Sequence, residues 1–181
     1  MKIKTLLIAH AFLFVGLAII AFFTDGTGGG GDSLTHYFIS ESAWSTPSYF
    51  LDLWGKPVFT LLSSPFAQFG FLGIKLLNIL VGVLSSFVTC LVAKELNKPY
   101  YWLILPIAFI APAFYAYTFS GLTEPLFALF ITAGIYAVIR KNFVLACILI
   151  SFLPFIRSEG LLFIGVFGLY YLLNKKWKLL P

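Results

Sequence analysis

Charged residues are scarce in this 181-residue chain, and their scarcity is the first constraint on its class. Asp, Glu, Lys and Arg together make up 10% of the residues, whereas a typical soluble domain carries about a quarter. Hydrophobic residues make up 60% of the chain, and the mean hydropathy is +0.97. This composition excludes an ordinary soluble globular protein, and we predict an integral membrane protein.

Cysteine is also rare, and basic residues are not gathered in one place. The two cysteines, Cys90 and Cys147, lie inside apolar runs, so a disulfide framework or a zinc site lacks the necessary ligands. The net charge of +5 comes from basic residues dispersed near the ends of apolar runs. This distribution is typical of membrane topology determinants, and we expect no nucleic-acid partner.

Six apolar runs are candidates for membrane-spanning helices, because a span needs about 20 mostly apolar residues. We predict an all-α, polytopic transmembrane helix bundle that forms a single transmembrane domain over residues 1–181. The expected spans are 5–23, 71–93, 100–118, 122–139, 143–156 and 160–174. The first is expected to be an uncleaved signal anchor, and the last two are short for a span. The segment "KPVFTLLSSPFAQFG" at 56–70 is interrupted by prolines, and we expect it to be interfacial.

The charges fall on opposite sides of these expected spans. Nine basic residues share one side with a single acid, Glu95, and the other six acids lie on the other side. The positive-inside rule then predicts cytoplasmic termini in the cell (inner) membrane. The first long loop, about residues 24–56, is expected on the extracytoplasmic (periplasmic) side.

The stretch "GGGGDSLTHYFISES" at 28–42 is the polar part of this loop. Helical spacing places Leu34 and Phe38 on one face and Asp32, His36 and Ser40 on another. We predict a short amphipathic helix at the membrane interface, with its polar side outward or toward a cavity. Asp32 has two open interpretations, as a helix cap or as a functional carboxylate.

Two further polar motifs are expected on the same side of the membrane. In "SGLTEPLFALF", Glu124 and Pro125 mark a helix start, which the helix dipole alone would explain. In "FLPFIRSEGLLF", Arg157 and Glu159 interrupt an apolar stretch, and such costly charges often mark a site. Lys75, just inside the second expected span, is interpreted as a snorkelling residue.

In the order and placement of these motifs the chain resembles the GT-C type of polytopic membrane glycosyltransferases. The matching features are an aspartate in the first external loop ("GDSLTHYFISESAW"), a proline- and aromatic-containing segment that returns to the membrane ("WGKPVFTLLSSPFAQFG"), a "TEP" helix start and an "RSEG" turn. These enzymes include mannosyltransferase-like branches that use polyprenyl-phosphate sugars. They usually contain several hundred residues, so the resemblance implies that this chain is the N-terminal part of a longer protein.

The resemblance implies an inverting transfer of a hexose from a polyprenyl-phosphate sugar donor, at the lipid interface, to an unidentified acceptor. Asp32 would act as the general base that takes a proton from the acceptor hydroxyl. Arg157, with Lys56 or Lys75, would stabilise the charge of the departing lipid phosphate.

The remaining roles implied by the resemblance are in substrate binding. Glu124 and Glu159 would orient the arginine or bind sugar hydroxyls, and His36 would join the substrate-binding residues. A divalent cation held by Asp32 and His36 is an open alternative for the cofactor. A non-enzymatic transporter or channel subunit, or an assembly partner, is the open alternative for the function.

Overall fold

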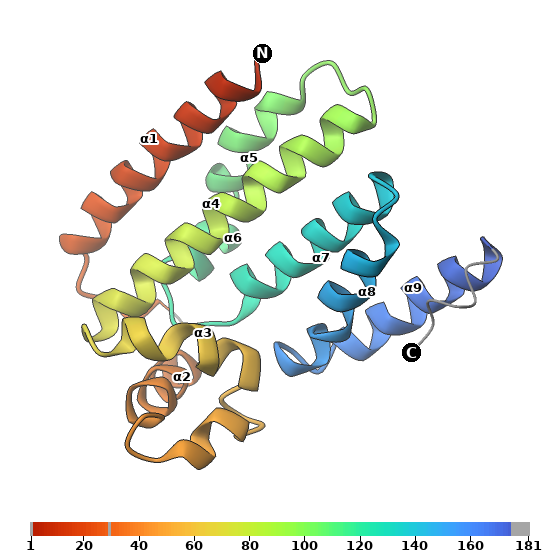
Figure 1. Cartoon of the computed structure of the whole chain (residues 1–181). Coiled ribbons are helices and arrows are strands. Elements are labelled where there is room, and N and C mark those ends of the chain that lie inside the picture. Colours follow the sequence, from red (N-terminus) through yellow and green to blue (C-terminus); the bar gives the residue numbers. More distant parts are fainter. Residues whose placement is uncertain (1, 29, 175–181) are drawn as a thin grey trace.

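The computed structural model is a helical protein organised around one long central helix, α4 (Phe71–Glu95) (Figure 1). It describes residues 2–28 and 30–174, and none of these residues is in a strand. The first helix, α1 (Ile3–Phe22), packs on one side of α4, and α7 (Glu124–Ile139) packs on another. The predicted all-α class is confirmed.

The prediction of six spans is wrong in number. Among the described residues only α1 and α4, with 20 and 25 residues, are individually long and apolar enough to cross a membrane. The expected span 100–118 is divided into η2 (Tyr101–Leu103), α5 (Ile104–Ile110) and α6 (Pro112–Thr118). The last two are bent by 75° and would count as a third span only if taken together. The bend follows from Pro112, because proline lacks an N–H and disfavours helical geometry in the preceding residue.

The three C-terminal runs form shorter helices than a span requires. The run expected at 122–139 is α7 with 16 residues, and the run at 160–174 is α9 (Gly160–Leu173) with 14 residues. These helices are about 24 and 21 Å long, compared with a hydrocarbon thickness of about 30 Å. The run at 143–156 is divided between α8 (Phe143–Ser151) and η3 (Leu153–Phe155).

The segment expected to be external and the proline-containing segment fold together at the N-terminal end of α4 (Figure 1). They form α2 (Gly30–Ser42), η1 (Pro47–Leu51) and α3 (Pro57–Ala67), which we call the α2–α3 unit (residues 30–67). The short helix predicted in 28–42 is confirmed as α2. The expected interfacial segment 56–70 contains the short helix α3 and the turn that leads into α4.

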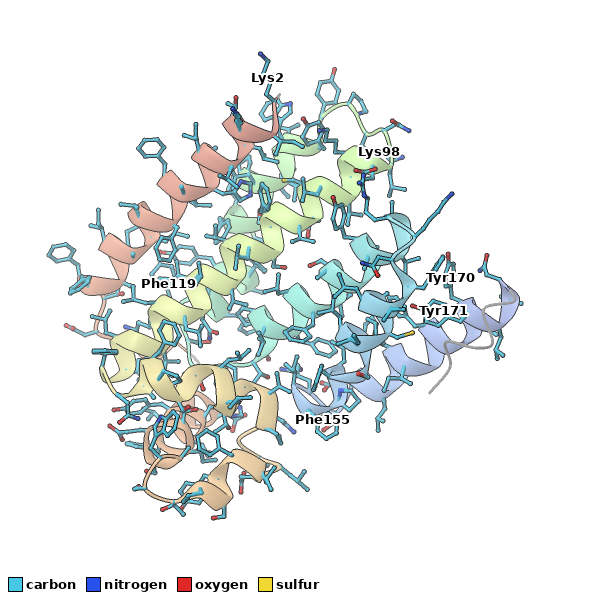
Figure 2. All side chains as sticks on the ribbon, in the orientation of Figure 1. Lys2, Lys98, Phe119, Phe155, Tyr170 and Tyr171 are labelled. Carbon is cyan, nitrogen blue, oxygen red and sulfur yellow. The ribbon has the colours of Figure 1, made fainter. Side chains whose placement is uncertain are left out.

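The opposite end of the molecule carries basic side chains. Figure 2 shows Lys2 and Lys98 together at this end, away from the α2–α3 unit. There Arg140 pairs with Glu95 at 3.0 Å, which joins the C-terminal ends of α7 and α4. Three of the nine basic residues expected on the cytoplasmic side, Lys175, Lys176 and Lys178, lie outside the described residues.

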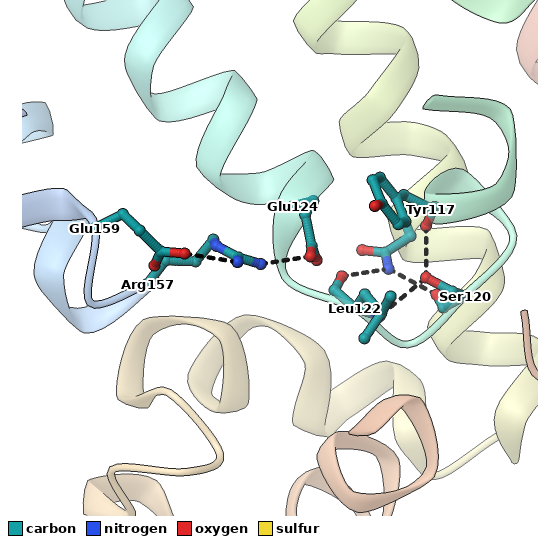
Figure 3. Close-up of polar contacts among 7 residues, drawn as sticks. Tyr117, Ser120, Leu122, Glu124, Arg157 and Glu159 are labelled. Atoms are coloured by element: carbon teal, nitrogen blue, oxygen red, sulfur yellow. Dashed lines mark hydrogen bonds and ion pairs between the residues drawn. The ribbon is translucent and has the colours of Figure 1, made fainter. Parts of the chain in front are cut away.

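Asn78 fixes the start of α7 against the N-terminal half of α4. Its side chain is fully buried, and its amide nitrogen donates to the carbonyl oxygens of Ser120 at 2.7 Å and Leu122 at 2.9 Å (Figure 3). One turn earlier, Lys75 is also buried and donates to the Thr24 carbonyl oxygen at 2.6 Å. Lys75 is therefore held inside the protein, and the interpretation as a snorkelling residue is wrong.

We expect Asn78→Leu to lower the free energy of unfolding by about 1–3 kcal/mol, because two backbone carbonyls would lose a buried donor. Thermal unfolding in detergent, followed by circular dichroism, measures this loss. Asn174→Ala is the matched control, since its amide donates to the Tyr170 carbonyl oxygen at an exposed position and its loss should cost no more than about 0.5 kcal/mol. Equal losses in the two variants would contradict the positioning role of Asn78.

Candidate functional site

A pocket of about 220 Å³ lies between the α2–α3 unit, the start of α7 and the turn immediately before α9. Its lining includes all six residues that the sequence indicated for the site, namely Asp32, His36, Lys56, Glu124, Arg157 and Glu159. Trp54, Leu122, Thr123 and Ser158 complete the lining. The three polar motifs, which are far apart in the sequence, therefore meet at one place in the fold.

Arg157 is the centre of the ionic contacts in this pocket (Figure 3). Its Nη1 lies 2.5 Å from Oε1 of Glu124, the first residue of α7. Its Nη2 donates to Oε1 of Glu159, immediately before α9, at 2.9 Å. The side chains of Arg157 and Glu124 are 27% and 29% exposed, whereas that of Glu159 is 57% exposed. Arg157 therefore joins the starts of two helices through one half-buried and one exposed ion pair.

These contacts determine how much of the guanidinium charge is available to a ligand. Burial alone would lower the pKa of Arg157, but the hydrogen bond to Glu159 and the charge of Glu124 outweigh burial and raise it. In return, the hydrogen bond from Arg157 lowers the pKa of Glu159. Because one cation is shared by two carboxylates, the cluster carries no spare positive charge.

Lys56 is the second cation of the pocket and has an unusual backbone conformation. It precedes α3 with a φ of 62°, and its Nζ donates to the Ser158 hydroxyl at the long distance of 3.5 Å. The other non-glycine residues with positive φ in the described chain, Asn97 and Lys141, follow helix C-caps, where this conformation is common. Lys56 has no such explanation, and strained backbone of this kind is concentrated at functional sites.

His36 supplies a neutral polar group to the pocket wall. Its side chain is buried, and burial lowers the pKa of His36 although the carboxylates of Asp32 and Glu124 act in the opposite direction. The imidazole is therefore neutral at pH 7. Its Nδ1 and the Oε2 of Glu124 are buried atoms without a hydrogen-bond partner among the described residues. Such atoms are costly to leave unpaired, and both belong to side chains that line the pocket.

Asp32 presents a carboxylate that nothing in the described chain engages by an ion pair or hydrogen bond. The side chain is exposed, and Asp32 is the third residue of α2, which begins at Gly30. Its place is thus in the first turn, where the helix dipole favours a negative charge, rather than at the cap. The geometry leaves this carboxylate free to accept a proton.

The alternative of a divalent cation gains no support from this geometry. Among the described residues no group of three or more His, Cys, Asp or Glu side chains is placed to hold a metal ion. Asp32 and His36 alone would supply two ligands, and metal sites in proteins usually need more.

Two positioning residues were missed by the sequence reasoning, and one candidate lies elsewhere. Asn78 was detectable, because an amide in a long apolar run is a costly residue that needs a partner. Ser33 gave no such signal: its hydroxyl accepts from the Gly121 N–H at 2.6 Å and donates to the Thr27 carbonyl oxygen at 2.7 Å. Lys75, predicted as an alternative partner of the phosphate, is engaged with Thr24 and does not line the pocket.

Comparison with protein-family models, with curated proteins and with solved structures finds no match to this chain. The resemblance to the GT-C enzymes therefore rests on the four sequence motifs alone.

We expect Glu124→Gln to destabilise the protein more than Glu159→Gln. The first change leaves the half-buried Arg157 with one charged partner and should cost about 1–3 kcal/mol. The second removes an exposed partner and should cost at most about 1 kcal/mol. Both values come from unfolding of the purified variants in the same detergent, and the reverse order would contradict the assignment of Arg157–Glu124 as the structural pair.

Proposed function

We propose that this chain transfers a sugar from a polyprenyl-phosphate-linked donor to an acceptor hydroxyl at the extracytoplasmic face of the membrane. The observation that supports this proposal best is the unengaged carboxylate of Asp32 in the same small pocket as Lys56, Arg157 and two unpartnered buried polar atoms. Pockets for drug-sized ligands occupy roughly 300–1,000 Å³, so a volume of about 220 Å³ is suited to a single sugar ring.

Asp32 acts as the general base in the proposed step. Its carboxylate accepts the proton of the acceptor hydroxyl while the hydroxyl oxygen attacks the anomeric carbon. The bond between that carbon and the phosphate oxygen breaks, and the lipid phosphate leaves with the electron pair. Attack on the face opposite the leaving group inverts the anomeric configuration. The exposed position of Asp32 at the pocket supports this role.

Lys56 is assigned as the main contact for the leaving phosphate. Arg157 already shares its charge between Glu124 and Glu159, whereas Lys56, among the described residues, makes one long hydrogen bond to Ser158 and no ion pair. A lysine ammonium is a compact cation that binds phosphate as a point charge. Arg157 then serves as a positioning residue that fixes the carboxylates around the pocket.

Glu124 and His36 are assigned to the sugar hydroxyls. A sugar hydroxyl both donates and accepts, so one hydroxyl can pair with the His36 Nδ1 in either neutral tautomer, and a neighbouring hydroxyl of the same ring can donate to Oε2 of Glu124. A phosphate at the same place would oppose the charge of Glu124. The two buried atoms therefore favour the sugar ring on this wall, and the phosphate belongs near Lys56.

The first prediction from this function is that Asp32→Asn lowers the rate of sugar transfer by about 10²- to 10⁴-fold, because the amide cannot accept the proton. Transfer of a labelled hexose from a polyprenyl-phosphate donor is measured in proteoliposomes at equal protein content. Asp25→Asn, an exposed acid outside the pocket, is the matched control and should keep the parental rate. Full turnover by Asp32→Asn would remove Asp32 as the base.

If the parental chain transfers none of the hexoses tested, a transporter subunit or an assembly partner becomes the better proposal.

The second prediction is that Lys56→Asn raises the KM for the donor about tenfold or more, since a charged hydrogen bond contributes about 1.5–3 kcal/mol. Asparagine tolerates positive φ, so this variant removes the charge while keeping the backbone conformation. The KM for the acceptor should stay unchanged, and Lys56→Arg should restore most of the donor affinity. An unchanged donor KM in Lys56→Asn would assign the phosphate to another group.

A further inference from the structure

The α2–α3 unit buries several hydroxyl-bearing and other polar side chains and exposes several large apolar ones. On α2 the buried residues are Ser33, His36 and Ser40, whereas Leu34 and Phe38 are exposed. A surface helix in water has the opposite pattern, with its apolar stripe against the core. Of the polar face predicted to point outward or toward a cavity, His36 and Ser40 are turned into the protein, whereas Asp32 is exposed, and Asp32 and His36 line the pocket.

On α3 the hydroxyl-bearing residues are likewise buried, together with Phe59 and Ala67. Thr60, Ser63 and Ser64 are fully buried, whereas Leu61 is 60% exposed. The hydroxyls of Ser40 and Ser63 lie 2.6 Å apart and join α2 to α3. Small and hydroxyl-bearing residues at helix contacts, with large apolar residues outside, are typical of packing in lipid.

A group of large apolar side chains extends from this unit, and we call it the apolar rim. It consists of Trp44, Leu51, Leu53 and Trp54, which are 61–79% exposed. Residues 43–54 include one charged residue, Asp52, whose Oδ1 accepts from the Gly55 N–H at 2.7 Å. Tryptophan and leucine at the edge of a membrane protein are favoured at the boundary of headgroups and acyl chains.

The helix lengths place this unit beside the bilayer rather than far above it. The Arg140–Glu95 pair aligns α7 with α4 at their C-terminal ends. At the other end, Asn78 holds the connection that leads into α7, seven residues inside α4, which is about 10 Å below the α4 N-terminus. The short helices therefore leave space in one leaflet, and α3 packs on α4 and η3 at this level.

We propose that the α2–α3 unit lies in the membrane interface, with the apolar rim inserted among the acyl chains of the leaflet at the N-terminal end of α4. The irregular backbone around η1 limits the depth, because unpaired peptide groups are excluded from the hydrocarbon core. The rim therefore reaches the boundary of headgroups and acyl chains. Since Trp54 belongs to both the rim and the pocket lining, the pocket lies next to lipid. This inference does not depend on the proposed sugar transfer.

The test uses Trp44 as a native fluorescent probe in the full chain. Trp54, Trp102 and Trp177 are replaced by Phe, and the protein is reconstituted in phosphatidylcholine vesicles with or without bromine at carbons 6 and 7 of the acyl chains. We expect the brominated lipid to lower Trp44 emission by roughly half or more, and aqueous acrylamide to have little effect. A chain whose only tryptophan is introduced by Lys98→Trp, in an exposed turn at the other end, provides the water-exposed control.

A second variant tests the insertion of the rim itself. Leu53 is 79% exposed, so Leu53→Asp should fold in detergent like the parent, yet it should remove roughly half or more of the quenching of Trp44 by brominated lipid. Lys98→Asp is the control for the added negative charge and should leave the quenching unchanged. Unchanged quenching in Leu53→Asp would overturn the assignment of the rim as the inserted surface.

Two other outcomes would also overturn the proposal. Strong quenching of Trp44 by acrylamide, without an effect of brominated lipid, would place the rim in water. Protection from both quenchers, together with disulfide cross-linking of a Leu51→Cys chain lacking its native cysteines, would show that a second copy of the chain covers the rim.

Discussion

Two hydrogen bonds from the side chain of Asn78 determine where the pocket is built. They hold the carbonyl oxygens of Ser120 and Leu122 against α4. The first residue of α7 follows two residues after Leu122, so α7 begins beside the interior of α4 and not beside its N-terminus. Glu124 is therefore presented below the end of the long helix, and Arg157 must approach that level to pair with it. A buried amide in an apolar helix is costly unless it is paired; the nitrogen of Asn78 is paired twice, whereas its Oδ1 has no partner among the described residues.

A second connection, between α2 and the loop before α7, positions the α2 wall of the pocket. Ser33 accepts from the Gly121 N–H, and a Cβ atom at position 121 would lie within 2.5 Å of the Ser33 carbonyl oxygen. Glycine at this position is required by close approach of two backbones. Because Ser33 follows Asp32 and lies one turn before His36, the contact brings both site residues of α2 over the start of α7. The glycine-rich tract before α2 thus leads into a helix that is held by a specific contact.

The sequence predicted which polar residues lie together more reliably than it predicted the lengths of the helices. Charged motifs in an apolar chain are few, and their cost in an apolar environment makes them conspicuous, so all six candidate residues line one pocket. Hydropathy measures how apolar a run is and takes no account of its geometry, so it did not separate α5 from α6 at Pro112 or detect that α7 and α9 are short. The direction of the polar face of α2 also could not be read from spacing alone, because helical periodicity identifies a face without telling which side is buried. Ser33 and Lys75 found backbone partners far away in the sequence, and no local pattern predicts such contacts.

The two cations of the pocket differ in how far their charges are already neutralised. A charge next to apolar surface is weakly solvated, so a permanent partner stabilises it. Arg157, which is 27% exposed, has two carboxylate partners, and its charge is consequently committed to the fold. Lys56 is half-buried in the same pocket lining, and among the described residues it makes one long hydrogen bond, to Ser158, and no ion pair. A ligand phosphate would thus gain most beside Lys56, whereas an uncharged, hydroxyl-bearing ring would gain most at the wall of His36 and Glu124.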